Sequence, residues 1–190
     1  MIGNQMSLDH LLILHETVKT GTLGVPQLRP IQEIPIIHKC FPVNMIFFKK
    51  IQGVWGHCFI DDSHQSCFWN KPFAYIGRLK ELKGIIATDY SLFRDYSIAE
   101  QKWNCFKNRV IAYHWQQGLN VIPTASWSIP DSFEWCWDGL PKNSVLGITT
   151  NGITTAKEGY RLFILGLDEL VKRLNPIALI VCGSFFYMDV

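Results

Sequence analysis

Short apolar runs alternate with longer amphipathic stretches along most of the chain. The runs with the length and composition of strands are Val43–Phe48, Val54–Ile60, Ile85–Ala87, Leu119–Ile122, Ser144–Ile148 and Ile177–Val181. The stretches with helical spacing or helix-capping residues are 70–83, 97–117, 131–138 and 155–174. Strands that alternate with helices in this way are typical of a mostly parallel sheet with helical crossovers.

The alternation predicts an α/β fold with a mostly parallel sheet of about six strands. Two architectures satisfy it: an incomplete barrel of the TIM type, or an open doubly wound sheet. A complete eight-stranded barrel typically needs about 250 residues, and the chain has 190. We favour the barrel, which would be incomplete at this length. Because parallel crossovers are right-handed, all strand carboxyl ends should lie at one edge.

The last predicted helix has the clearest signals. Thr155 and Glu158 have the spacing of a capping box, and Lys172 and Arg173 stand in the final turn, where the helix dipole favours cations. Its apolar stripe consists of Tyr160, Phe163, Ile164, Leu167, Leu170, Val171 and Leu174. A single stripe at this spacing indicates a helix that packs on a core.

The first part of the chain has a different composition. Residues 1–25 predict a helix that Ser7 caps and a pair of glycines ends. Four prolines within residues 26–42 exclude a long helix there and predict an extended segment. We accordingly divide the chain into an N-terminal helix with a Pro-rich lead-in, residues 1–42, and a single α/β domain, residues 43–190.

The short strand Ile85–Ala87 leads into a polar turn that begins at Asp89, and Asp61 and Asp62 follow the preceding strand. Loops at the carboxyl ends of parallel strands hold functional side chains, so we expect these three carboxylates to meet and take catalytic roles. Close carboxylates can divide acid and base roles, share a hard metal such as Mg²⁺, or accept N–H groups of a nucleobase. The alternative is structural: Asp61 or Asp62 caps the next turn, and Asp89 pairs with Arg94.

A polar set at the start and inside of the long predicted helix consists of Arg94, Asp95, Asn104 and Arg109. We take these residues as ligand-binding candidates, because an arginine fork suits a phosphate or a carboxylate. Asparagine is also a poor choice for a helix face that only packs. The alternative is an ion-pair network in which Arg109 reaches back to Asp95 or Asp89 and holds the loop.

Two further groups complete the ligand-binding candidates. Thr150 and Asn151 follow the fifth predicted strand and Ser184 follows the sixth, in short turns that can present backbone N–H groups to a phosphate. Trp127 belongs to a cluster of indoles that can stack a base or anchor a protein partner. Packing of a short helix on the sheet is the structural alternative for these indoles.

A zinc site has little support in the sequence. His57, Cys58, His64 and Cys67 lie within eleven residues, but their spacing matches no zinc pattern, and we expect no zinc. The sequence identifies no other cofactor, although the carboxylates are compatible with Mg²⁺. The six cysteines are scattered without a CxxC pair, which argues against a disulfide framework.

The overall composition restricts the setting more than the function. Hydrophobic residues make up 48% of the chain and charged residues 18%, which excludes a disordered protein. The net charge of +2 is too small to imply nucleic-acid binding by itself. No apolar run reaches the roughly 20 residues of a membrane span, so we expect a cytoplasmic protein without membrane contact.

Several short blocks occur in a fixed order: Phe59–Asp62, Thr88–Asp95, Trp103–Asn104, Asn108–Arg109, Val121–Thr124, Trp127 and Asp138–Gly139. Over roughly residues 35–184 the chain therefore resembles a family of uncharacterised proteins, defined only as a domain of unknown function, from bacteria, phages, plasmids and integrative elements. The family's Arg-Asp-Met-Pro is here Arg94–Ser97, without the proline. The family pattern also continues past the Gly183–Ser184 turn, whereas this chain ends at Val190. The resemblance implies a mobile-element protein in a bacterial host cell and no particular activity.

A fainter likeness is to transglycosylase-type barrels, which exchange bases in nucleic acid. These barrels also place an acidic residue after an early strand, a second Asp later and a Gly-containing turn after a late strand. Likeness at the level of a fold is a weak warrant for function.

Two functional hypotheses follow, and neither fixes whether the protein is an enzyme. In the first, the strand-end rim binds, and can act on, a nucleotide or a nucleic acid. In the second, the protein is a non-catalytic anti-defence factor that binds and inhibits a host nuclease such as a CRISPR-Cas effector. The first requires a cavity where the carboxylates of Asp61, Asp62 and Asp89 converge, and the second requires an exposed contact surface.

Overall fold

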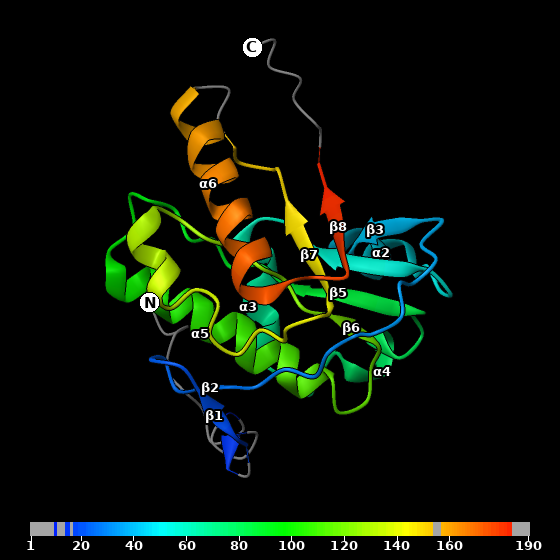
Figure 1. Cartoon of the computed structure of the whole chain (residues 1–190). Coiled ribbons are helices and arrows are strands. Elements are labelled where there is room, and N and C mark those ends of the chain that lie inside the picture. The colour runs from blue at the N-terminus through cyan, green and yellow to red at the C-terminus, as the bar shows by residue number, and fades with distance from the viewer. Residues whose placement is uncertain (1–9, 11–13, 16, 154–156, 184–190) are drawn as a thin grey trace.

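The computed structural model describes residues 10, 14–15, 17–153 and 157–183, and has a mixed α/β architecture (Figure 1). A four-stranded parallel sheet contains β3 (Cys40–Pro42), β4 (Trp55–Cys58), β5 (Gly84–Thr88) and β6 (Val121–Ile122) in that spatial order. A doubly wound sheet requires a reversal of strand order, and this sheet has none.

Two smaller sheets flank the four-stranded one. The strands β7 (Val145–Thr149) and β8 (Ala178–Cys182) form a parallel pair, and β1 (Lys19–Thr20) and β2 (Val25–Pro26) form an antiparallel pair. A single bridge between Thr124 and Gly147 joins the strand end after β6 to β7. Among the strands that the structure describes, the outer strands β3 and β8 do not pair, so the barrel is not closed.

Helices follow most of the strands along the chain. They are α2 (Val43–Lys49), α3 (Asp62–Asn70), α4 (Ile76–Leu79), α5 (Ile98–Trp115), the 3₁₀ helix η1 (Pro130–Glu134) and α6 (Lys157–Leu174). Ser97 caps α5 by accepting a hydrogen bond from the Glu100 N–H, 3.2 Å away, as the sequence predicts for a helix that begins there.

The sheet has an apolar core on each face, because successive residues of a strand point to opposite sides. On β5, Ile85 and Ala87 belong to the larger core, which also takes in residues of α3, α5 and α6. Ile86, between them, belongs to a second, smaller core together with Trp55 of β4 and Val145 of β7. Burial on both faces explains why the strands read as continuous apolar runs.

The segment before β3 crosses the amino-terminal end of β7. The Ile31 N–H donates to the Ser144 hydroxyl at 2.8 Å, and the Val145 N–H donates to the Ile31 carbonyl at 2.9 Å. Ile31 and Ile37 pack on the second core. The Pro-rich segment is therefore hydrogen-bonded to the start of β7, and its last residues form β3.

The prediction of a strand at Val43–Phe48 is wrong, because these residues form α2. Val43 and Ile46 are buried while Met45 and Phe48 are exposed, which is helical spacing. Periodicity alone does not separate a short buried strand from a short helix. Pro42 occupies the N-cap position of α2 and ends the strand immediately before it.

The predicted helix over 70–83 is also wrong in its position. The helix α3 begins at Asp62 and ends at Asn70, and only the single turn of α4 lies within the predicted range. Assigning Asp61 and Asp62 to a strand end concealed the start of α3. The short helix expected over 131–138 is η1, a 3₁₀ helix that ends at Glu134.

The N-terminal prediction lies largely outside the described residues, as does Thr155 of the predicted capping box. Within the described part, Gly21 and Gly24 have positive φ angles of 68° and 59° and form the turn between β1 and β2. These are left-handed conformations that glycine adopts without strain.

Candidate functional site

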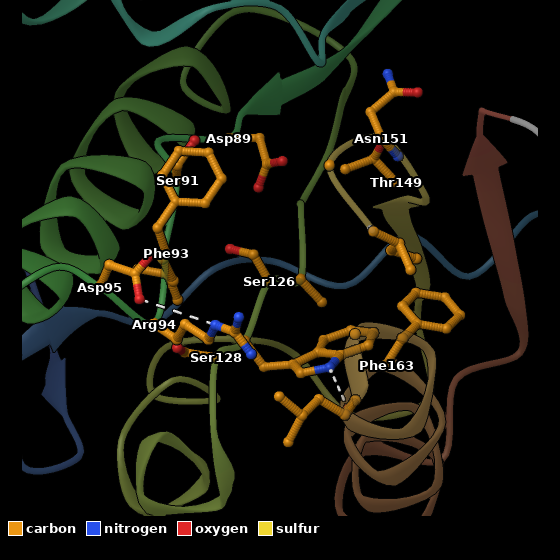
Figure 2. A pocket seen from close by; sticks show the side chains of 17 residues that line it. Asp89, Ser91, Phe93, Arg94, Asp95, Ser126, Ser128, Thr149, Asn151 and Phe163 are labelled. Carbon is orange, nitrogen blue, oxygen red and sulfur yellow. Dashed lines mark hydrogen bonds and ion pairs between the residues drawn. The ribbon is translucent and has the colours of Figure 1, made fainter. Parts of the chain in front are cut away.

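A cavity of about 330 Å³ opens at the carboxyl ends of β5, β6 and β7 (Figure 2). Its floor and walls come from the loops that follow these strands and from the first half of α6. The residues on which the argument depends are Asp89, Phe93, Ser126, Trp127, Ser128 and Phe163. The carboxyl ends of parallel strands are where α/β proteins place their binding sites.

Asp89 is the acidic group inside this cavity. The side chain is half-buried, and its Oδ1 atom is buried without a hydrogen-bond partner among the described residues. The pKa of the carboxyl is raised to about 7, mainly by burial and also by the nearby Asp62, while the Ser126 hydroxyl and the Arg109 guanidinium oppose the rise. The carboxyl therefore exists in both protonation states near neutral pH.

The backbone that carries Asp89 is fixed by a glutamine from α3. The fully buried Gln65 accepts a hydrogen bond from the Asp89 N–H at 2.9 Å, and its amide nitrogen donates to the carbonyls of Asp89 and Ile60 at 3.3 and 3.0 Å. The β4–β5 pairing also shifts by one residue directly before this point, between His57 and Cys58. Such irregularities re-aim the residues that follow them.

The next two residues of the loop are held in the same way from α5 and α3. Asn108 exchanges two hydrogen bonds with the backbone of Tyr90, at 2.8 and 3.1 Å. Asn104 donates to the Ser91 carbonyl at 2.8 Å, and the Asp62 carboxylate accepts from the N–H and the hydroxyl of Ser91. Four buried or half-buried polar side chains thus fix three consecutive backbone positions.

Lys107 packs under this loop. Its Nζ atom lies 3.7 Å from the centroid of the Tyr90 ring, a cation–π distance. Burial lowers the pKa of this lysine to about 8, and the neighbouring carboxylates of Asp62 and Glu100 oppose the decrease. Lys107 does not line the cavity.

Arg109 also lies outside the cavity, although the sequence suggested it as a ligand-binding residue. Its side chain is almost fully buried and donates to three backbone carbonyls: to Asp138 at 2.8 Å, to Thr124 at 3.2 Å and to Cys136 at 2.7 Å. This arrangement supports the structural alternative, in which Arg109 holds a loop, but its partners are carbonyls and not Asp95 or Asp89.

The three candidate aspartates do not share one cavity. Asp61 is exposed and caps α3, where it accepts hydrogen bonds from the N–H and the hydroxyl of Ser63. Those bonds lower the pKa of Asp61. Burial raises the pKa of Asp62, which binds Ser91 behind the cavity wall. Of the three, only Asp89 lines the cavity.

Arg94 and Asp95 lie at the mouth of the cavity and form an exposed ion pair with 3.8 Å between Arg94 Nε and Asp95 Oδ1 (Figure 2). Arg94 also acts electrostatically on Glu158, in the first turn of α6. Arg94 does not pair with Asp89, contrary to the structural alternative drawn from the sequence. An exposed guanidinium at the entrance remains available to an incoming anion.

Trp127 forms one wall of the cavity against α6. Its indole N–H donates to the Leu162 carbonyl at 3.3 Å, and its ring stacks on Phe163 with 5.3 Å between centroids. A Cβ atom at Gly166 would lie 2.0 Å from the indole nitrogen, so glycine is needed there for the two elements to approach. The packing alternative therefore accounts for part of the Trp127 surface, and the remainder faces the cavity.

The loop after β7 closes the opposite part of the rim. Asn151 lines the cavity, and its N–H donates to the Thr149 hydroxyl at 3.0 Å. The Thr149 hydroxyl in turn donates to the Cys182 carbonyl at 3.0 Å. The buried Thr150 N–H donates to the same carbonyl at 2.9 Å, so Thr150 serves the backbone here. Ser184 lies outside the described residues.

Comparison with known proteins places the chain. Residues 17–190 match the model of the domain of unknown function DUF4417. The chain belongs to this family. The match confirms the resemblance seen in the sequence blocks and extends it towards both ends.

Two curated relatives of this DUF4417 chain are phage proteins, and the chain is similar to each over most of its own length. It is 34% identical over 169 residues to the Gene 1 protein of Mycobacterium phage D29, covering 87% of this chain and 62% of that protein. It is 33% identical over 168 residues to the Gene 1 protein of Mycobacterium phage L5, covering 87% and 73%. The chain thus spans less than two thirds of the D29 protein. No solved structure matches it.

The remaining predictions concern metals and membranes. Within the described ranges, no group of three or more His, Cys, Asp or Glu side chains is arranged to hold a metal ion. Among the helices that the structure describes, none combines the length and the apolar composition that a membrane crossing requires.

The sequence did not single out Ser126, Ser128, Phe93 or Gln65. The first two flank Trp127 in the loop that follows the fourth predicted strand, and this Ser-Trp-Ser sequence was the available signal. Gln65 gave no signal, because its role depends on the pairing of two strands distant in sequence.

Proposed function

We propose that this domain binds a nucleotide or a nucleic-acid base in the cavity at the carboxyl ends of β5, β6 and β7. The observation that carries the proposal is Asp89: its backbone is held by Gln65, and its carboxyl group lines a cavity with one oxygen buried and without a partner among the described residues. Buried polar groups are normally satisfied, and one that is not, at a strand-end cavity, is a candidate for ligand recognition.

The shape and lining of the cavity support this proposal. Its volume of about 330 Å³ lies at the lower end of the range of small-molecule sites. Trp127 and Phe163 stack on each other and form an aromatic wall. The half-exposed Phe93 also lines the cavity (Figure 2). Aromatic rings beside a small number of polar groups suit a planar heterocycle, since every nucleobase presents a face that can stack.

The distribution of charge supports the same ligand class and gives it an orientation. A carboxyl group lies inside the cavity and a guanidinium lies at the mouth, 57% exposed. A base would enter towards Asp89, and a phosphate would remain near Arg94. An unbranched fatty or sugar ligand would not use these two charges together.

The chemistry of Asp89 allows a reaction as well as binding. With a pKa of about 7 the carboxyl can accept or donate a proton at neutral pH. Carboxyl groups tuned in this way serve as general acids and bases. We therefore include proton transfer to or from the bound base in the proposal.

The finer architecture belongs to the same proposal. Strands in sequential order, helical crossovers and a second core enclosed by β4, β5, β7 and their neighbours support an incomplete barrel of the TIM type. In that architecture the carboxyl ends of the strands are the functional face. We propose that the protein acts there within the bacterial host cell, as a phage or mobile-element product.

The test is a titration of the purified chain with nucleoside monophosphates and with short single-stranded DNA and RNA, followed by tryptophan fluorescence and calorimetry. Binding should weaken at least about 10-fold in Asp89→Asn, because the ionised acceptor is lost. Asp168→Asn, on the exposed side of α6, is the matched control and should bind as the unchanged chain does. Equal binding by both variants, or no binding by any ligand at millimolar concentration, would overturn the proposal.

The alternative, inhibition of a host defence nuclease through surface contact, predicts a different result in a second experiment. Affinity purification of the chain from host cells would then yield the nuclease, and Asp89→Asn would leave that capture unchanged. Capture that depends on Asp89 would favour the cavity instead.

A further inference from the structure

We infer that the cavity selects a base edge with two adjacent N–H donors, which among the common nucleobases is the edge of guanine. The inference rests on the function proposed above and names the ligand of the same site. It follows from which polar groups inside the cavity are already occupied and which are not.

The positive charge of Arg109, which acts on the Asp89 carboxyl, is not available to a ligand. Arg109 directs its guanidinium at three backbone carbonyls and is almost fully buried. Two cavity hydroxyls are also occupied, because Ser91 donates to Asp62 and Thr149 donates to the Cys182 carbonyl. The inner part of the cavity therefore offers a carboxylate that needs donors and lacks a free cation among the described residues.

Two other hydroxyls line the cavity. That of Ser126 is occupied by a hydrogen bond to the Asp89 carboxyl group. Ser128 lines the cavity with only 8% of its surface exposed, and its Oγ atom has no hydrogen-bond partner among the described residues. A hydroxyl can donate to a carbonyl or a ring nitrogen. The ligand edge that fits has N–H donors for Asp89 and an acceptor for a serine.

Guanine presents this pattern, with the ring N1–H and the exocyclic 2-amino group side by side and the 6-carbonyl next to them. An ionised carboxylate accepts two parallel N–H bonds from such an edge. Adenine and cytosine place one amino group beside a ring nitrogen whose lone pair would face the carboxylate. Uracil places a single N–H between two carbonyls. Ionised Asp89 therefore favours guanine over the other three.

Charge also fixes how a guanine nucleotide would lie. The carboxylate inside repels a phosphate, and Arg94 at the mouth attracts one. The base would lie against Trp127 and Phe163 with its Watson–Crick edge towards Asp89. Because the paired form of Asp89 is the ionised one, affinity for guanine should rise as the pH increases through about 7, the pKa of this carboxyl.

The experiment compares guanosine, inosine, adenosine, cytidine and uridine monophosphates by calorimetry at pH 6 and pH 8. Inosine monophosphate differs from the guanosine nucleotide only by the missing 2-amino group. The unchanged chain should bind guanosine monophosphate at least about 10-fold more tightly than inosine monophosphate, and more tightly at pH 8 than at pH 6. In Asp89→Asn the difference between guanosine and inosine monophosphates should shrink to about 2-fold or less.

Each other outcome contradicts the inference in a recognisable way. Equal or tighter binding of the adenosine, cytidine or uridine nucleotide, still dependent on Asp89, would overturn the choice of guanine and leave the proposed function standing. Affinity for guanosine monophosphate that falls between pH 6 and pH 8 would show that the neutral carboxyl is the recognising form, and would also overturn it. Failure of all five nucleotides to bind would contradict the proposed function and the inference together. Should Asp89→Asn not fold, the comparison of guanosine with inosine in the unchanged chain decides alone.

Discussion

Arg109 and Asp89 are two charges brought inside the same domain, and the surrounding structure treats them in opposite ways. The Arg109 guanidinium has three carbonyl partners and no contact with the cavity. The Asp89 carboxyl has one oxygen without a partner among the described residues, faces the cavity and carries a raised pKa. The backbone around both residues is hydrogen-bonded, so poor local packing does not explain why one charge has partners and the other does not.

The comparison separates a charge used for structure from a charge kept for a ligand. When backbone carbonyls accept hydrogen bonds from a buried cation, the loops that carry those carbonyls are stabilised. The cation then has few N–H groups left for a ligand. Gln65 fixes the backbone of Asp89, but one carboxyl oxygen has no hydrogen-bond partner among the described residues. That arrangement lowers the stability of the fold and leaves the carboxyl able to react. Burial alone therefore does not mark a functional residue, and the state of its hydrogen bonds does.

The largest expected effect is on the structural side of the comparison. Arg109→Met should lower the free energy of unfolding by about 3–5 kcal/mol, because three buried carbonyls lose their donor. Urea denaturation followed by circular dichroism measures it. Arg94→Met, at the exposed mouth, is the control and should stay within about 0.5 kcal/mol of the unchanged chain. A loss under about 1 kcal/mol in Arg109→Met would contradict the structural role.

Asp89→Asn should have the opposite sign. The folded chain holds the Asp89 proton up to about pH 7, while an unfolded chain releases it near the ordinary value of 3.8. Between these two values the folded state binds more protons, so the stability of the unchanged chain falls as the pH rises through this window. The amide removes that cost, and Asp89→Asn should be more stable by about 1–3 kcal/mol at pH 8 and about equal near pH 3.5.

Denaturation curves of both chains at several pH values would measure this gain. A variant that is less stable at pH 8 would mean that the carboxylate has a partner in the folded chain, and the contrast with Arg109 would disappear.

The cavity wall gives a smaller effect. Replacing a helical glycine with alanine normally stabilises a helix by about 0.5–1 kcal/mol. At Gly166 the added methyl group would collide with Trp127, so Gly166→Ala should instead destabilise by about 1–2 kcal/mol and shift the tryptophan emission. Gly77→Ala in α4, where nothing lies within 4 Å of the added atom, is the matched control and should show the ordinary gain.

The smallest effect separates the aspartates of the same rim. Asp61→Ala should lower the urea midpoint slightly at pH 7, because the helix cap is lost, and Asp61→Asn should restore most of it. Hydrogen bonds from Ser63 lower the pKa of Asp61, so its contribution is present above the unfolded pKa and is lost as the pH falls through the lower folded value. Neither variant should change ligand binding, whereas a change would place Asp61 in the site.

The sequence predicted the parts of the fold that repeat a simple pattern. The strands around Ile86 and Leu146 and the helices that became α5 and α6 were found within a few residues, because apolar periodicity and caps determine them locally. Between Val43 and Lys83 the strand predicted at Val54–Ile60 is confirmed as β4, but the strand predicted before it and the helix predicted after it were wrong. There the apolar runs are short, and tertiary contacts decide between strand and helix.

The sequence predicted the position of the candidate site in the fold more accurately than the residues that line it. Asp89 was identified because it follows a clear strand, but the separation of Asp61, Asp62 and Arg109 from the cavity depends on partners 2 to 29 positions away. Hydrogen bonds of that kind leave no periodic trace in a single sequence. Ser128, which the structure adds to the site, is unremarkable until its burial and its open hydroxyl are seen together.

The junction between the four-stranded sheet and the β7–β8 pair determines how ligand binding affects the stability of the whole domain. The strand end after β6 meets β7 through the bridge of Thr124 with Gly147 and its hydrogen bonds of 2.8 and 2.9 Å. Asp89 lies on one side of this seam, and Asn151 and Phe163 lie on the other. A ligand that contacts residues on both sides would link the two sheets across this bridge, and binding should therefore raise the temperature at which the domain unfolds.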